Sequence, residues 1–136
     1  KREYSNILRF INESKISSSV MIISNIQQNH MPHFFLSSKL VIAPTLYESI
    51  SIPVFEAFYY KTPLCASRIY AIEDQVGEAG ELFDPYSVKS IYNSLKKILD
   101  SNTNEIKKYV FKGRDKLNYF STKRFNNLLK MTLNEN

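Results

Sequence analysis

The sequence predicts an α/β fold, a Rossmann-like parallel sheet with flanking helices, in a single domain over residues 1–136. Short, continuous apolar runs alternate with segments whose apolar residues recur at helical spacing, which indicates parallel strands joined by helices. A chain of 136 residues, 43% hydrophobic and 13% aromatic, is also large enough for one buried core. No apolar stretch approaches the roughly 20 residues needed to span a bilayer.

The first part of the chain is expected to hold two helices and two strands. Apolar positions within residues 4–11 share one helix face, and the run Val-Met-Ile-Ile at 20–23 reads as a buried strand. Residues 31–38 predict a short helix, because Pro32 suits a first helical turn. The apolar run at 40–43 then predicts a strand covered on both faces.

The middle of the chain repeats this alternation. Pro53 predicts the start of a helix that runs to about Tyr60. Residues 64–66 are expected to form the next strand, and residues 81–83 a short last one. Strands and helices in this order predict a parallel sheet.

The last third is predicted to be helical. Apolar residues recur at helical intervals over 88–99, directly after Ser87, a favourable N-cap residue. A second helix is expected over 106–120 and a final one over 125–133.

The formal charge of +5 is concentrated in this last third. Residues 1–88 hold seven basic and nine acidic side chains, whereas residues 89–130 hold eleven basic and three acidic ones. We expect these charges to form the solvated faces of packed helices. Attraction to anionic lipid at a membrane surface is the alternative function, and nucleic-acid binding is not expected, because no recognition motif accompanies the charge.

The single cysteine, Cys65, lies in an apolar run and is predicted to be inert core. With no basic-then-apolar leader, the sequence predicts a reduced, cytoplasmic setting, with attachment to the inner face of the membrane as an alternative. No metal site is expected, because the chain has no aspartate-x-aspartate pair, and His30 and His33 read as ordinary surface or helix-start residues.

Two glutamates, Glu48 and Glu56, flank the junction between the 40–43 strand and the following helix. Backbone N–H groups at a helix start suit a diphosphate, and a carboxylate can hold two hydroxyls of a sugar. Taken alone, the spacing also fits a simpler interpretation, in which Glu56 complements the helix dipole and Glu48 lies in solvent. The amides expected near the helix start are those of Ser49, Ile50, Ser51 and Ile52.

The wider pattern is more specific than this pair. In order along the chain stand Pro-Thr-x-x-Glu-Ser from Pro44, Pro-x-x-Glu-Ala-Phe from Pro53, then residues 61–67 and 76–85, and finally Tyr-Phe-Ser at 119–121. Together they resemble the C-terminal donor-binding half of retaining glycosyltransferases of the GT-B fold, the "glycosyl transferases group 1" family. The resemblance runs from about residue 20 to the final helix.

This resemblance implies a role for each matched residue. Glu48 would contact hydroxyls of the donor hexose and help to hold its anomeric centre, which makes it the expected catalytic residue. Glu56 would bind the ribose, and the amides of residues 49–52 would meet the sugar and diphosphate. Three further positions, Ser24, Asn25 and Ile26, match the loop that contacts the base. Thr45 matches a serine of the family and fits a turn residue equally well, while Asp74 is expected to have a structural loop role.

The implied reaction is transfer of a hexose from a nucleoside-diphosphate sugar with retention, usually without a metal or other cofactor. The implied setting is polysaccharide or lipopolysaccharide assembly. The implied partners are a nucleotide sugar and an N-terminal acceptor-binding domain or partner chain. The alternatives are a nucleotide-sugar-binding module without turnover and a purely structural domain.

The chain also departs from the family pattern. Ser51 replaces a usual glycine, Ile50 a usual phenylalanine, and Lys61 a glycine where a left-handed backbone is expected. The arginine and lysine that normally neutralise the diphosphate have no counterpart here. A fragment, a split subunit and a degenerate remnant therefore all remain open.

Overall fold

The structure is a computed structural model that describes residues 2–124, 126 and 127. It divides into two compact units, residues 1–31 and residues 32–136, which are described separately below. No composition change in the sequence marked this division, and the prediction of one domain stays a prediction. The apolar positions of the final expected helix, Phe125, Leu128, Leu129 and Leu133, lie outside the described residues.

The first unit is built on the helix α1 (Arg2–Glu13), which confirms the helix expected from residues 4–11. The strand expected at residues 20–23 is wrong. Val20 has extended backbone angles, but this segment belongs to no sheet among the described residues, and Met21 is 82% exposed. An apolar run becomes a buried strand only when another strand hydrogen-bonds to it, and the described part of this unit contains none.

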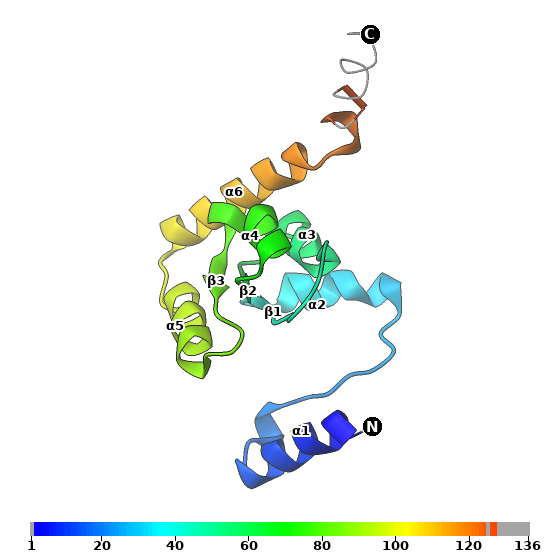
Figure 1. The fold of residues 1–136 in the computed structure, drawn as a ribbon, viewed down its shortest axis with the longest axis vertical. Helices are drawn as coiled ribbons and strands as arrows, with labels where there is room; N and C mark the ends of the chain where they lie inside the picture. The colour runs from blue at the N-terminus through cyan, green and yellow to red at the C-terminus, as the bar shows by residue number, and fades with distance from the viewer. Residues whose placement is uncertain (1, 125, 128–136) are drawn as a thin grey trace. The chain divides into compact units, whose positions relative to one another are not determined.

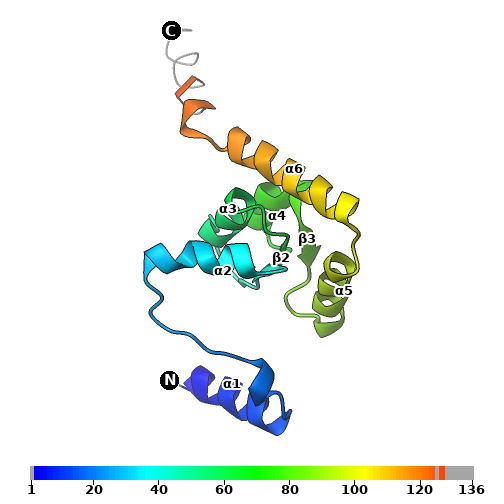
Figure 2. The same ribbon diagram turned by 180° about the vertical axis from the view of Figure 1, so that it is seen from behind.

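The second unit contains a sheet of three parallel strands in the order β1-β2-β3 (Figures 1 and 2). The strands are β1 (Val41–Ala43), β2 (Leu64–Ser67) and β3 (Glu81–Phe83). Each of the three lies where the sequence predicted a strand, and the parallel pairing of β1 with β2 and of β2 with β3 confirms the predicted fold class.

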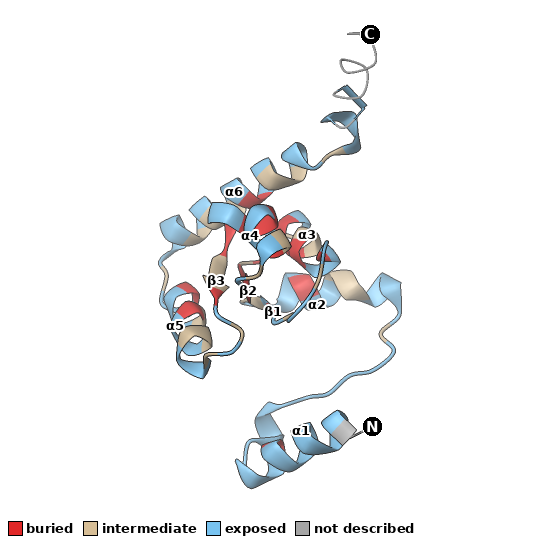
Figure 3. Ribbon diagram, in the orientation of Figure 1, coloured by how far each residue is buried: buried red, intermediate tan, exposed pale blue. Residues whose placement is uncertain are grey.

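The strands differ in how they are covered. The central strand β2 is buried along its whole length (Figure 3). Ile42 of β1, by contrast, is 46% exposed. The expectation that the 40–43 strand is covered on both faces is therefore wrong for Ile42. Ile42 is the register partner of Cys65 and shares its face of the sheet, and the helix that covers this face, α5, packs against β3 and β2.

Besides a short 3-10 helix, Gly77–Ala79, the described part of this unit contains five α-helices. Four of them match predicted helices, and the seven-residue α4 was not predicted. Helix α6 contacts α3 and α4, while α5 packs against β3 and β2. The helices are α2 (Met31–Ser37), α3 (Ile52–Tyr59), α4 (Tyr70–Val76), α5 (Val88–Leu99) and α6 (Thr103–Tyr119).

Side-chain caps fix the starts of α5 and α6. The hydroxyl of Ser87 accepts a 3.2 Å hydrogen bond from the Ser90 amide, as its N-cap prediction requires. At α6 the Asn102 side chain accepts from the Glu105 amide, and the Glu105 carboxylate accepts from the Asn102 amide. These caps hold both helices at defined positions after β3.

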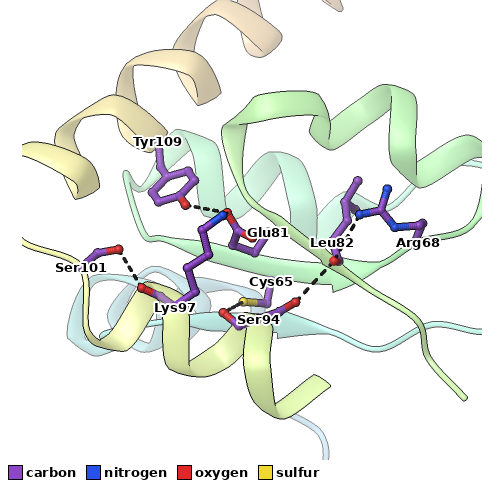
Figure 4. Close-up of polar contacts among 8 residues, drawn as sticks. All are labelled: Cys65, Arg68, Glu81, Leu82, Ser94, Lys97, Ser101 and Tyr109. Atoms are coloured by element: carbon purple, nitrogen blue, oxygen red, sulfur yellow. Dashed lines mark hydrogen bonds and ion pairs between the residues drawn. The ribbon is translucent and has the colours of Figure 1, made fainter. Parts of the chain in front are cut away.

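Cys65, Phe83 and Ile98 form a buried cluster between the sheet and α5. The Cys65 thiol donates a 3.4 Å hydrogen bond to the Ser94 carbonyl oxygen, and burial raises its pKa to about 12 (Figure 4). Cys65 is fully buried, which confirms its predicted core position. Its thiol stays protonated and unreactive at neutral pH.

Candidate functional site

The carboxyl ends of the three strands share one edge of the sheet. The register pairs Ala43 with Ala66 and Ser67 with Phe83, so the segments that follow each strand emerge side by side. In parallel α/β sheets this edge is where ligands bind. The segment after β1, residues 44–51, carries the first predicted glutamate and leads into α3.

The two glutamates of the predicted site are half-buried. Glu48 lies in the loop before α3, and Glu56 lies within α3. Neither carboxylate has a hydrogen bond or an ion pair to any residue that the structure describes. Half-buried carboxylates without partners keep their full capacity to accept hydrogen bonds from a ligand.

One of the four amides expected to meet the diphosphate is already engaged. The Ser51 amide donates a 2.9 Å hydrogen bond to Oε1 of Gln75, and Ser51 is 1% exposed. The amides of Ser49, Ile50 and Ile52 donate to no other described residue. The loop therefore offers three backbone donors rather than four.

Ser51 occupies the position of a family glycine without strain. Its φ of −101° lies in the extended region, which a serine adopts readily. It serves as the N-cap residue of α3, and Pro53 stands in the first turn, where its missing N–H costs no hydrogen bond. The replacement of glycine by serine is thus compatible with the start of α3.

A cavity of about 420 Å³ adjoins this loop. It brings Ser49 and Ile50 together with α4 and with the residue that ends α6, although neither glutamate lines it. The lining residues are Ser49, Ile50, Phe55, Tyr70, Ala71, Asp74, Gln75 and Phe120.

The contribution of α4 to this region was missed by sequence reasoning. Ile72 and Val76 are fully buried and Gln75 is 5% exposed, so a glutamine stands among core residues of a short helix. A polar side chain between two apolar positions at helical spacing was the available signal, because a buried amide needs hydrogen-bond partners.

Two other predicted residues have local structural contacts. The Thr45 hydroxyl donates a 3.3 Å hydrogen bond to the Tyr47 carbonyl oxygen, as expected of a turn residue. Asp74 lies in α4 rather than in a loop, and its carbonyl oxygen accepts a hydrogen bond from the Lys116 ammonium group. The loop role expected for Asp74 is therefore wrong, because the chain between β2 and β3 folds into a helix.

The residues expected to contact the base belong to the first unit. Asn25 has a positive φ of 57°, which asparagine tolerates better than most residues, and Ile26 is half-buried, whereas Ser24 is exposed. Their role toward a base stays a prediction.

Within residues 2–124, 126 and 127 no group of three or more His, Cys, Asp or Glu side chains is arranged to hold a metal ion. Over the same residues, none of the helices has the length and hydrophobicity to traverse a bilayer.

Comparisons with known proteins bear on the fold of this chain. Residues 2–116 match the family model described as "Glycosyl transferases group 1". Among solved structures, sucrose-phosphate synthase from Thermosynechococcus elongatus aligns with 99% of this chain and 35% of its own, with a TM-score of 0.80 at 18% identity. The C-terminal domain of a glycosyl transferase group 1 family protein from Francisella tularensis aligns with 88% of this chain and 62% of its own, with a TM-score of 0.73 at 18% identity. These likenesses confirm the predicted fold.

Two curated relatives are similar in sequence. An MMP alpha-(1->4)-mannosyltransferase from Mycolicibacterium hassiacum is 33% identical over 96 residues, which is 68% of this chain and 23% of that protein. An O-antigen chain mannosyltransferase B from Escherichia coli is 24% identical over 88 residues, which is 64% of this chain and 23% of that protein. The chain thus spans about a quarter of the length of these relatives.

Proposed function

The chain belongs to the glycosyl transferases group 1 family, and from this premise we propose that it forms the donor-binding part of a glycosyltransferase. The proposed reaction transfers a hexose from a nucleoside-diphosphate sugar with retention at the anomeric carbon. One observation carries the proposal. Two half-buried carboxylates without partners among the described residues, Glu48 and Glu56, stand before and within the helix at the carboxyl edge of a parallel sheet.

The two carboxylates have different tasks in this proposal. Glu56 accepts hydrogen bonds from the two neighbouring hydroxyls of the ribose, and Glu48 accepts from hydroxyls of the hexose near its anomeric centre. Each charge-assisted hydrogen bond contributes about 1.5–3 kcal/mol when water is excluded, enough for a tenfold change in affinity.

The backbone donors act on the leaving group. Departure of the nucleotide builds negative charge on the diphosphate, and the amides of Ser49, Ile50 and Ile52 stabilise that charge. The positive end of the α3 dipole adds to this effect. We propose that this stabilisation is supplied without a bound metal ion.

The proposed setting follows from the relatives. One is named for O-antigen chains, and both are named as mannosyltransferases. We propose a role in polysaccharide or lipopolysaccharide assembly in the cytoplasm, together with an acceptor-binding domain or partner chain. The basic side chains of α5 and α6 support contact with anionic lipid at the inner face of a membrane.

Ligand titration of the 136-residue chain tests the donor site. UDP- and GDP-sugars are titrated by calorimetry against the wild type, Glu48→Gln and Glu56→Gln, and we expect at least a tenfold loss of affinity in each variant. Glu73→Gln is the matched control, because Glu73 lies on α4 in an exposed ion pair with Arg68 that contributes little. Equal affinity in all four proteins, or a loss confined to Glu73→Gln, would refute the assignment.

A second candidate function is a nucleotide-sugar-binding module without turnover. The engagement of the Ser51 amide by Gln75 favours it, because one donor fewer remains to stabilise the leaving diphosphate. Sugar transfer by the chain, with its acceptor-binding half supplied in the same assay, would exclude this alternative.

A further inference from the structure

Gln75 connects α4 to the loop that carries the proposed donor site. Its Oε1 accepts the 2.9 Å hydrogen bond from the Ser51 amide, and its Nε2 donates to the Ser49 carbonyl oxygen at 3.0 Å. The same Nε2 donates to the Ala71 carbonyl oxygen at 3.0 Å, within α4. One side chain therefore binds both the N–H and the C=O of the loop, two residues apart.

Both residues of this contact are buried. Gln75 is 5% exposed and Ser51 is 1% exposed, so water cannot readily replace either partner. The primary amide of Gln75 is bonded on both its oxygen and its nitrogen, which also fixes which end faces Ser51. The backbone between Glu48 and α3 is thereby held at two points.

The residues held in this way lie next to groups proposed to bind the ligand. Ser49 directly follows Glu48, and Ser51 directly precedes the first residue of α3. Ile50, between the two tethered positions, is 65% exposed, and its amide donates to no other described residue. The two hydrogen bonds from Gln75 thus restrict the backbone on either side of Ile50 and leave the Ile50 amide available to a ligand.

We propose that Gln75 is a positioning residue, which sets the conformation of residues 49–51 and so presents Glu48 and the Ile50 amide to the nucleotide sugar. This inference rests on the proposed donor site. Gln75 contacts the loop backbone rather than the donor, and it acts by making the binding conformation the prevailing one before the ligand arrives. Without these hydrogen bonds the loop spends part of its time in other conformations. The apparent affinity for the nucleotide sugar then falls in proportion to the fraction of molecules that have the binding conformation.

Gln75→Met tests the proposal, because methionine is similar in length and fills the buried space without hydrogen bonds. We expect the variant to bind a UDP- or GDP-sugar about tenfold more weakly than the wild type. We also expect hydrogen exchange at the Ser51 amide to become at least about tenfold faster, because its acceptor is lost. Gln75→Glu keeps the acceptor for Ser51 and loses the donor to Ser49, so it should protect the Ser51 amide and still bind more weakly.

Ser94→Ala is the control for a general loss of stability. The Ser94 hydroxyl is also buried and donates a 3.3 Å hydrogen bond to the Leu82 carbonyl oxygen, on α5 rather than on the loop. This variant should lose stability without a change in donor affinity or in Ser51 exchange. Unchanged Ser51 exchange or undiminished donor affinity in a folded Gln75→Met protein would overturn the proposal. If the wild type binds no nucleotide sugar, the proposed function fails, and Ser51 exchange still decides whether Gln75 fixes the loop.

Discussion

The hydroxyl of Tyr109 donates a 2.6 Å hydrogen bond to Oε1 of Glu81, linking α6 to β3. The Lys97 ammonium group of α5 lies 2.8 Å from the same oxygen, so three elements meet at one carboxylate (Figure 4). The Glu81 side chain is 17% exposed, and a carboxylate at this depth depends on donors to offset its desolvation. These contacts hold α5 and α6 against β3.

Tyr109→Phe should destabilise the protein by about 1–3 kcal/mol, because the half-buried Glu81 carboxylate loses one of its two donors. Urea unfolding followed by circular dichroism measures the loss. Tyr92→Phe is the control, since Tyr92 lies on α5, is 60% exposed and should change stability by less than about 0.5 kcal/mol. Equal midpoints for the two variants would contradict the structural role of this hydrogen bond.

The stability of the protein should fall at alkaline pH because of Cys65. Burial raises the pKa of this thiol from 9.0 to about 12, so the unfolded thiol ionises at a pH where the folded one does not. Between about pH 9 and pH 12 the unfolded chain binds fewer protons than the folded protein, and stability falls by up to about 1.4 kcal/mol per pH unit. The pKa of Tyr109 is also raised, by burial and by its hydrogen bond to Glu81, and adds to this fall above pH 10.

Cys65→Ala separates the thiol from other alkaline effects. The variant should be less stable at pH 7, because it leaves a small cavity in a fully buried site. Its stability should nevertheless change less between pH 8 and pH 10 than that of the wild type. Parallel pH profiles of unfolding free energy for the two proteins would show that the thiol does not contribute.

Sequence patterns predicted most of the sheet and its helices because these elements carry local signals. The helix at 88–99 has apolar residues at regular helical spacing and a serine cap, and β2 is a short apolar run. Helix α4 was missed because its two buried apolar residues do not establish a period, and it lacks the first-turn proline from which the equally short α2 was predicted. The exposure of Ile42 in β1 was missed because it depends on which strands α5 covers, not on the strand's own residues.

For the candidate site, the sequence predicted the loop that carries Glu48 but not the residue that holds this loop, Gln75. Glu48 and Glu56 stand in a recognisable local pattern, and the turn at Thr45 could be anticipated. The contact between Ser51 and Gln75 spans 24 residues, and no local pattern encodes a hydrogen bond between segments so far apart. Which of the expected amides is free therefore became clear only from the folded chain.

Lys61→Gly should stabilise the protein by about 1 kcal/mol. Lys61 follows α3 with a φ of 61°, which confirms the left-handed backbone expected where the family has glycine. The Thr62 amide donates to the Ala57 carbonyl oxygen and the Lys61 amide to that of Phe58, the hydrogen-bond pattern of a helix end that favours glycine. Thermal unfolding measures the gain, and Lys61→Ala, which keeps the Cβ atom and removes the charge, should show none. A gain of equal size in both variants would point to the charge instead.

Gly113→Ala should destabilise the protein although alanine favours helices. By helix preference alone, replacing glycine with alanine in a helix interior stabilises the fold by about 1 kcal/mol. Gly113 is buried where α6 packs on α3, however, and a Cβ atom there would lie 2.8 Å from Cδ1 and 3.1 Å from Cγ of the Phe58 ring. Phe58 is 5% exposed and its ring packs edge-on against Phe55, so it has little room to move. Overpacking of this kind costs about 1–3 kcal/mol, and we expect a net loss of about 1 kcal/mol in urea unfolding.

A double-mutant cycle identifies Phe58 as the cause. Phe58→Ala removes the Cγ and Cδ1 atoms that the new methyl group would meet, at its own cost in core packing. In that background Gly113→Ala should be neutral or stabilising, because only the helix preference of alanine remains. If Gly113→Ala instead costs the same free energy with and without the Phe58 ring, the close approach of α6 to α3 at this glycine does not limit the residue there.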